Sequence, residues 1–342
     1  MKLVVLVGVC LGQSLDILEG NSINPLAYLI AVSKVLKSEN VAKLLDQFGA
    51  SSPQRLSNVT YVRPIDVETL QQSLEFSYIP MCPEKQVLIH ECICSQEYTS
   101  IGFARDSEYR ASATVSYHKK TQQAVVSYKY TTGLRNWLSN LDFLLGPLEG
   151  APKGVMVHRG MLQYYQSIHN QTMKRVVNIL KTQEVKSIVV TGYSLGASIA
   201  TLSVPFWAKF KQNYNVPITV ISYAGARTGN LQAKLYYESL GIPIMRYTNR
   251  DDIIPMLPPR TLGYVHAGLE IHERRSAIPG RTELVVCSQD YEEDPKCSYG
   301  EPGLRSITRH FTPFNNFPIL PPYCSLDAIA NFNRPTRYEP NP

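Results

Sequence analysis

The chain has 342 residues, of which 44% are hydrophobic and 18% are charged, and its net charge is +6. This length allows one large domain or two small ones, and α/β folds of this size often form a single domain. The basic clusters are short, such as His118-Lys119-Lys120, and a solvated surface explains them better than a nucleic-acid site. After the N-terminus, no apolar run approaches the roughly 20 residues of a membrane helix. We therefore expect neither a nucleic-acid partner nor a stable membrane span.

The N-terminus is typical of a secretory signal peptide over residues 1–14, because one lysine precedes a short apolar run that ends in small residues. Residues 15–64 are interpreted as an N-terminal extension or pro-segment, with a helical apolar period over 24–48 followed by a polar, turn-rich stretch. Two glycosylation motifs begin at Asn58 and Asn170. Together with the cysteines, these features predict a secreted, extracellular glycoprotein.

Seven cysteines are present, and one of them, Cys10, lies in the apolar leader. The remaining six make an even number, and no pair has the spacing of a zinc ribbon, so disulfides are favoured over a metal site. Cys287 and Cys297 bracket a short polar loop that a disulfide would close. Reduced cysteines in the core are the alternative.

From residue 65 onward, strand and helix patterns alternate, which predicts one domain over 65–342 with a mostly parallel sheet. Alternating or β-branched apolar runs predict the strands, and apolar residues at helical spacing predict the helices. The expected strands are 112–118, 124–130, 185–191, 217–225 and 242–249, and the expected helices are 164–180 and 194–210.

The stretch G-Y-S-L-G, residues 192–196, lies between an expected buried strand and an expected helix. Gly-x-Ser-x-Gly in this context is the nucleophile elbow, in which small neighbours let the strand and the helix approach and expose the serine hydroxyl. Ser194 is therefore a candidate nucleophile, and the alternative is a serine that only caps the helix.

A serine hydroxyl needs a base to accept its proton, and in α/β-hydrolases the acid and then the histidine follow the serine along the chain. Asp251 and Asp252 follow an expected strand, where a loop-borne acid is expected. His310 lies near the end of the chain, and His266 is its competitor, on what looks like a continuing strand.

Several ordered motifs make the sequence from about residue 65 to about residue 324 resemble the secreted fungal triacylglycerol lipases, the class 3 lipase family of the α/β-hydrolase fold. The family's G-H-S-L-G-G corresponds to G-Y-S-L-G-A here, and its N-D-x-V-P-x-L-P-P corresponds to D-D-I-I-P-M-L-P-P at 251–259. The family's Y-G-x-P-R-x-G-N corresponds to Y-A-G-A-R-T-G-N at 223–230. The resemblance implies Ser194, Asp252 and His310 as the catalytic triad, with His266 on a noncatalytic position.

The resemblance also implies an oxyanion hole made by the backbone N–H groups of Leu195 and Thr131. The family's Arg-Gly before that threonine is Lys129-Tyr130 here, and tyrosine lacks the backbone freedom of glycine. A second departure is Tyr193 in place of the histidine in the elbow. The apolar segment after Thr131 corresponds to a lid helix that contacts the acyl chain, and a buried core helix is the alternative; the contact residues expected there are Trp137, Leu138 and Leu141.

The disulfides that the resemblance implies are Cys287–Cys297, Cys82–Cys324 and Cys92–Cys94. The sequence as a whole predicts a serine hydrolase that cleaves acylglycerol esters at a lipid–water interface and needs no metal or cofactor. The alternatives are a phospholipase or feruloyl-type esterase of the same fold, or a catalytically inactive lipid-binding homologue. The sequence does not indicate an oligomeric state.

Overall fold

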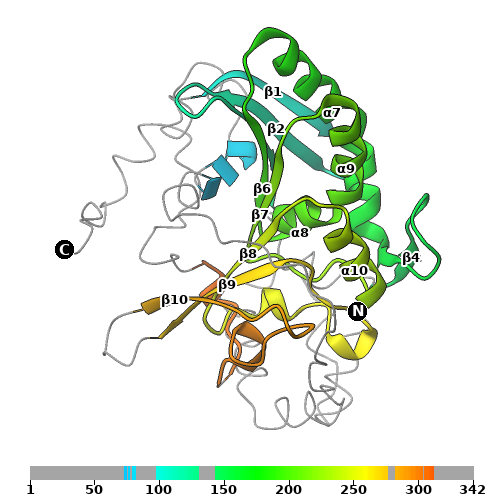
Figure 1. Cartoon of the computed structure of the whole chain (residues 1–342). Helices are drawn as coiled ribbons and strands as arrows, with labels where there is room; N and C mark the ends of the chain where they lie inside the picture. The colour runs from blue at the N-terminus through cyan, green and yellow to red at the C-terminus, as the bar shows by residue number, and fades with distance from the viewer. Residues whose placement is uncertain are drawn as a thin grey trace, which may run out of the picture.

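The computed structural model describes residues 73–74, 76–77, 79–81, 98–130, 143–275, 282–302 and 304–311. Its centre is an eight-stranded sheet (Figure 1). The strands, in spatial order, are β1 (Tyr98–Asp106), β2 (Ala111–His118), β3 (Gln123–Tyr128), β6 (Ser187–Tyr193), β7 (Ile218–Tyr223), β8 (Ile244–Asn249), β9 (Leu269–Arg275) and β10 (Thr282–Val286). The strands from β3 to β9 are parallel, and antiparallel pairs flank them on both sides.

Four helices follow or precede the parallel strands, in the alternation that the sequence predicts. They are α7 (Arg159–Thr182), α8 (Leu195–Leu202), α9 (Val204–Tyr214) and α10 (Leu231–Ser239). A small second sheet pairs β4 (Leu145–Pro147) with β5 (Met156–His158). The structure also has 3-10 turns: η1 (Ile79–Met81), η3 (Ile254–Met256), η4 (Arg260–Leu262), η5 (Ser298–Gly300) and η6 (Arg309–Phe311).

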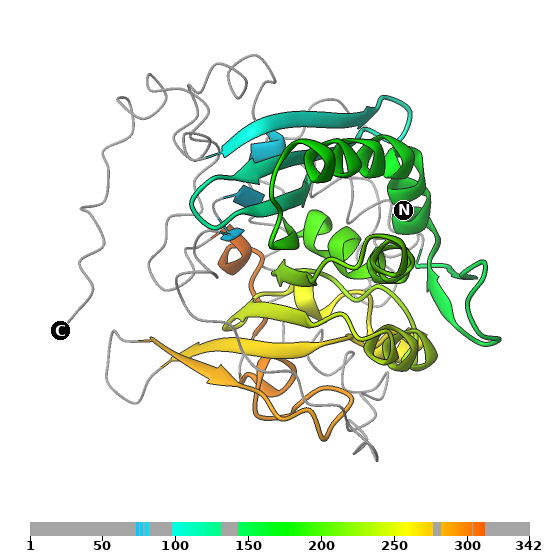
Figure 2. The same cartoon turned by 45° about the horizontal axis from the view of Figure 1, so that its top comes forward.

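The two faces of the sheet are covered differently (Figure 2). Helices α7, α9 and α10 lie on one face, where Ile168, Trp207 and Tyr237 belong to the larger apolar cluster. On the opposite face, Phe76 and Ile79 pack in a second cluster that includes Tyr193 at the end of β6. The buried strands therefore carry apolar side chains on both faces, as a parallel sheet requires.

The helix expected over 194–210 is wrong in one respect, because the structure divides it into α8 and α9 at Ser203. Pro205 explains the division: proline has no N–H to donate, and its ring obstructs the carbonyl group one turn earlier. At the division, the hydroxyl of Ser203 donates to the carbonyl oxygen of Ala200 at 2.7 Å. The result is a short α8 that packs closely against β6.

His266 does not lie on a strand, contrary to the sequence-based interpretation, because β9 begins only at Leu269. Within the described residues, no helix combines the length and the apolar character needed to cross a bilayer. The expected signal peptide, the extension over 15–64 with Asn58, and the cysteines at 82, 92, 94 and 324 lie outside the described residues.

Candidate active site

Ser194 occupies a sharp turn between β6 and α8, with φ 55° and ψ −121°. A positive φ is unusual for a residue with a side chain, so the surroundings must hold it. A Cβ atom at Gly192 would lie 2.3 Å from the backbone of Gly196, and one at Gly196 would lie 2.0 Å from the carbonyl oxygen of Tyr128. The two glycines therefore let β3, β6 and α8 meet at this turn, which is the steric arrangement of a nucleophile elbow.

The hydroxyl of Ser194 lies beside the imidazole of His310, although the two residues are 116 positions apart in the chain. Ser194 Oγ is 2.8 Å from His310 Nε2, and the residues are 2% and 1% exposed. The other ring nitrogen, Nδ1, is 2.8 Å from Asp252 Oδ2. An ionised carboxylate only accepts hydrogen bonds, so the arrangement assigns the proton to Nδ1 and leaves Nε2 to accept from the serine hydroxyl.

The loop after β8 holds Asp252 in place. Its other carboxylate oxygen, Oδ1, accepts from the backbone N–H of Ile254 at 2.9 Å, and its own N–H donates to the carbonyl oxygen of Asn249 at 3.0 Å. The carboxylate is thereby fixed at both oxygens and is 1% exposed. The three residues that the sequence nominates as nucleophile, base and acid are thus brought into one hydrogen-bonded chain.

Leu195 is the first residue of α8, directly after the serine. Backbone N–H groups in the first turn of a helix have no partner within that helix, and the helix dipole adds partial positive charge there. Ser198, one turn later, braces the turn, because its hydroxyl accepts from Ala226 N at 2.8 Å. The backbone N–H of Leu195 therefore lies at the N-terminus of α8, directly after Ser194, where the helix dipole contributes partial positive charge.

The other expected oxyanion donor, Thr131, and the expected lid residues Trp137, Leu138 and Leu141 lie outside the described residues. The structure does describe Lys129 and Tyr130, which directly follow β3. The N–H of Lys129 donates to Ser112 O at 2.9 Å, and its carbonyl oxygen accepts from the hydroxyl of Tyr164 at 3.2 Å. Burial raises the pKa of Tyr130 to about 12, so its hydroxyl is neutral at physiological pH.

His266 has a different environment from His310. Its Nε2 lies 2.7 Å from the carbonyl oxygen of Pro255, to which the neutral ring donates. Burial and the nearby Arg246 lower the pKa of His266 well below its ordinary value, so the ring is uncharged. Among the histidines that follow Asp252 in the chain, it is His310 that contacts Ser194.

A buried ion pair behind the acid loop was not anticipated from the sequence. Glu293 Oε1 and Oε2 each lie 2.6 Å from a guanidinium nitrogen of Arg227, and the two side chains are 1% and 2% exposed. Arg227 also donates to the carbonyl oxygens of Met256 and of Pro258, the latter at 3.0 Å. Glu293 therefore holds Arg227, and Arg227 holds the chain just beyond Asp252.

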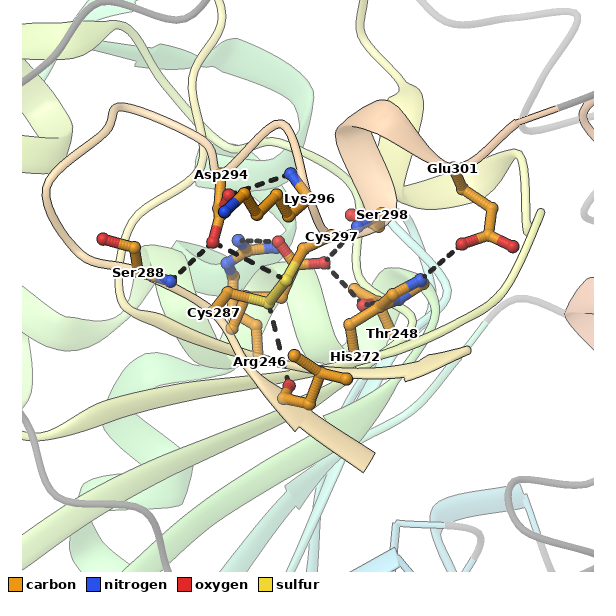
Figure 3. Close-up of a disulfide and its surroundings, with 12 residues drawn as sticks. Arg246, Thr248, His272, Cys287, Ser288, Asp294, Lys296, Cys297, Ser298 and Glu301 are labelled. Carbon is orange, nitrogen blue, oxygen red and sulfur yellow. Dashed lines mark hydrogen bonds and ion pairs between the residues drawn. A yellow bond between two sulfur atoms is a disulfide. The ribbon is translucent and has the colours of Figure 1, made fainter. Parts of the chain in front are cut away.

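The predicted disulfide between Cys287 and Cys297 is present and closes the loop that supplies Glu293 (Figure 3). The buried carboxylate of Glu270 accepts from Ser298 N, next to Cys297, at 3.2 Å, from Arg246 at 3.1 Å and from the hydroxyl of Thr248 at 2.6 Å. The disulfide thus closes the loop on itself, and the hydrogen bond from Ser298 N to the Glu270 carboxylate connects the end of the loop to β9.

The structure also bears on possible metal ligands and on the second glycosylation motif. Among the described residues, the group of potential metal ligands that lie close together is Cys287, Asp294 and Cys297. Its sulfur atoms are joined to each other, so they offer no thiolate to a metal. Asn170 of the second glycosylation motif is exposed on α7.

Comparison with known proteins shows similarity to lipases over part of the chain. Residues 125–262 match the model of the class 3 lipases. A lipase of Rhizomucor miehei is 28% identical over 209 residues, which cover 60% of this chain and 56% of that protein. The chloroplastic phospholipase A(1) DAD1 of Arabidopsis thaliana is 32% identical over 152 residues, covering 40% of this chain and 34% of that protein. This chain thus spans about half or less of the length of these curated relatives.

The structural comparison extends further along the chain. The solved structure of a Rhizomucor miehei triacylglyceride lipase has a TM-score of 0.66 at 23% identity, covering 77% of this chain and 99% of that one. The fold is therefore that of the fungal lipases, and the predicted α/β-hydrolase architecture is confirmed.

Proposed function

We propose that this chain, in which residues 125–262 form a class 3 lipase domain, is a serine hydrolase that cleaves the carboxylic esters of acylglycerols through an acyl-enzyme. The observation that carries the proposal is the chain of two 2.8 Å contacts that joins Ser194, His310 and Asp252. These three residues have different roles in the proposed reaction, and each role follows from the atom that faces its neighbour.

In the proposed acylation, Ser194 Oγ attacks the ester carbonyl carbon while its proton passes to Nε2 of His310. The carbonyl electron pair moves onto oxygen and then returns, and the bond to the glycerol oxygen breaks. That oxygen takes the proton from Nε2 and leaves as an alcohol. Water then attacks the acyl-enzyme by the same route and releases the fatty acid, so the steps use only groups of this chain and water.

Asp252 has the role of orienting the imidazole and stabilising the imidazolium that forms when His310 accepts the proton. The oxyanion would be stabilised by the backbone N–H of Leu195 and, as the resemblance implies, by that of Thr131. Each such donor is typically worth about 3–4 kcal/mol of barrier. We propose that Trp137, Leu138 and Leu141 belong to a lid helix and face the lipid. Such a lid would couple opening of the site to an oil–water interface.

Secretion is part of the proposal, because the N-terminal leader, the glycosylation motifs and the disulfide all fit an oxidising compartment. A phospholipase activity on the same site is the second candidate, which the 32% identity to a plant phospholipase A(1) favours. Both candidates use the same acyl transfer and differ in the head group that leaves.

The test is hydrolysis of a short-chain nitrophenyl ester by the full chain and by three single variants. Ser194→Ala and His310→Ala should reduce turnover to background, whereas His266→Ala should retain substantial activity because His266 contacts Pro255 and not the serine. Equal rates for the wild-type protein and Ser194→Ala would refute the proposed enzymatic activity and favour an inactive lipid-binding homologue. Comparing the rates of hydrolysis of emulsified triacylglycerol and of phospholipid vesicles then distinguishes the two candidate substrates. A jump in the rate of triacylglycerol hydrolysis above the solubility limit of the substrate would support the lid.

A further inference from the structure

We propose that Tyr193, together with the ion pair between Asp251 and Arg309, positions the imidazole of His310 against Ser194. This inference rests on the proposed function, since it concerns the group to which we assign the proton transfer. Tyr193 and Asp251 do not touch the reacting atoms in this proposal. They hold the short segment that carries His310, one from each side.

Tyr193 is the last residue of β6 and is 2% exposed. Its hydroxyl donates a hydrogen bond to the backbone carbonyl oxygen of His310. Its ring also packs on the imidazole, with the ring centroids 5.0 Å apart. Tyr193 and Ser194 are consecutive residues, so one short stretch of backbone carries the nucleophile and supports the base.

Tyr130 supports the tyrosine from the other direction. Its ring meets that of Tyr193 edge-on, at 83° and with the centroids 5.8 Å apart. Aromatic pairs prefer this edge-to-face geometry. The ring of Tyr193 therefore contacts Tyr130, two residues after the end of β3, and also the imidazole of His310.

The second support comes from the acid loop. Arg309 Nε lies 2.9 Å from Asp251 Oδ1, and the two side chains are 19% and 21% exposed. The N–H of Ser306 donates to the carbonyl oxygen of Asp251 at 2.8 Å, and a β-bridge joins Asp252 to Ser306. The residue before His310 and the residue before Asp252 are therefore paired, so the base and the acid are held in a fixed relation.

The segment needs such supports because its own secondary structure is slight. His310 lies in η6, a 3-10 turn of three residues. A turn of this size has little internal hydrogen bonding to resist displacement. Proton transfer requires short, aligned contacts, and a misplacement of about 1 Å can lower a rate by about a hundredfold.

Three of the residues that make these contacts lie at positions where the chain departs from the family motifs. Tyr193 replaces the histidine of the elbow motif, Tyr130 replaces the glycine before the oxyanion threonine, and Asp251 replaces the asparagine before the acid. Tyr193 and Asp251 reach the His310 segment directly, and Tyr130 packs against Tyr193. The three substitutions thus form one connected support in place of three unrelated changes.

The experiment measures kcat and KM of the full chain on a soluble nitrophenyl ester, for the wild type and for Tyr193→Phe. This change removes only the hydroxyl group and keeps the ring. We expect kcat to fall about tenfold with KM within about twofold of wild type, because substrate binding is untouched and the base is less well held. Tyr117→Phe is the matched control, because the hydroxyl of the buried Tyr117 also donates to a backbone carbonyl oxygen, that of Glu184 at 3.0 Å, but lies at the far end of β2.

A kcat for Tyr193→Phe within twofold of wild type, or a loss that Tyr117→Phe reproduces, would overturn the inference. So would a change confined to KM. Asp251→Asn gives a second measurement that does not depend on the core, because its side chain is partly exposed and the variant is expected to fold. Its kcat should also fall, by about threefold to tenfold, with KM unchanged.

Combining Tyr193→Phe and Asp251→Asn should reduce kcat by more than the product of the two single effects, since both hold one segment. A simple product would mean that they do not share a structural unit, against the inference. Failure of the proposed function looks different, because the wild-type protein itself would then show no turnover that depends on Ser194.

Discussion

Replacing Glu293 by glutamine is expected to destabilise the fold more than any change to a surface charge. The carboxylate of Glu293 makes two 2.6 Å contacts to Arg227 and accepts from the backbone N–H of His266 at 3.0 Å. Glutamine has nearly the same size, so the substitution leaves no cavity. It removes the negative charge that compensates Arg227 and replaces one acceptor oxygen by an NH2 group that faces the guanidinium.

The magnitude follows from the burial of the pair, since the two side chains are 1% and 2% exposed. Removing one partner of a buried ion pair typically costs about 3–5 kcal/mol, because an unpaired charge remains in a poorly solvated place. For a domain of this size, that corresponds to a fall of about 10 °C in Tm. The loss should appear whether or not the protein is active.

The assay is urea or thermal unfolding at neutral pH, followed by circular dichroism. Glu283→Gln is the matched control: it is the same substitution in an ion pair with Arg274, but the side chains there are 45% and 43% exposed. An exposed pair contributes about 0–1 kcal/mol, so the control should unfold close to the wild type. If Glu293→Gln were no less stable than Glu283→Gln, the reasoning about the buried pair would be refuted.

Three further outcomes can be measured in the same way. Gly196→Ala should destabilise the fold by about 1–3 kcal/mol and lower kcat, because its Cβ would lie 2.0 Å from Tyr128 O. The control is Gly160→Ala in α7, where the nearest atom would be 3.5 Å away, so the fold should be unaffected or slightly stabilised. Equal losses of stability in the two variants would contradict the steric argument. Replacing both Cys287 and Cys297 by serine should lower the free energy of unfolding by about 3 kcal/mol, because it opens a loop whose ends are separated by 10 residues. An unchanged unfolding midpoint would argue against this contribution of the disulfide. Stability should fall as the pH drops from about 6.5 to below about 4, because burial holds the pKa of His266 well below its ordinary value. Burial acts to raise the pKa of Glu293, but the charge and hydrogen bonds of Arg227, together with the other nearby charges, lower it overall. Both groups then bind more protons unfolded than folded, and Glu293→Gln should flatten the acid part of that curve, which a pH series of urea unfolding would check.

The elements around Ser194 were predictable because their signals are local. A buried β-branched run, two glycines and a following apolar helix stand next to one another in the sequence, and the structure has β6, the turn and α8 in that order. The end of α8 was missed because the apolar period continues through Ser203, and only the backbone chemistry of Pro205 interrupts the helix. The order of motifs also nominated Asp252 and His310, which the structure brings together with Ser194.

The contacts that support the site were not predictable in the same way. Arg227 and Glu293 are 66 residues apart, and Tyr193 and His310 are 117 apart. Neither pair produces a periodic pattern, because each partner belongs to a different element whose own pattern is already explained by packing. Arg227 lies within a recognised motif and Glu293 within an acidic loop, but the charges alone do not indicate that these two residues pair with each other.

The position of His310 in the chain has a consequence for the order in which the protein is made. The main sheet is complete at Val286, and Ser194 and Asp252 precede that residue, whereas His310 comes from a later turn. The ribosome adds about 5–20 residues per second from the N-terminus, and a domain generally folds as a unit. A nascent chain that ends at Val286 therefore contains every strand of the main sheet but still lacks the residue that we assign as the base. Under the proposed function, acyl transfer begins only when one of the last described segments docks between Tyr193 and the acid loop, so the newly made protein is inert towards esters until its folding is nearly finished.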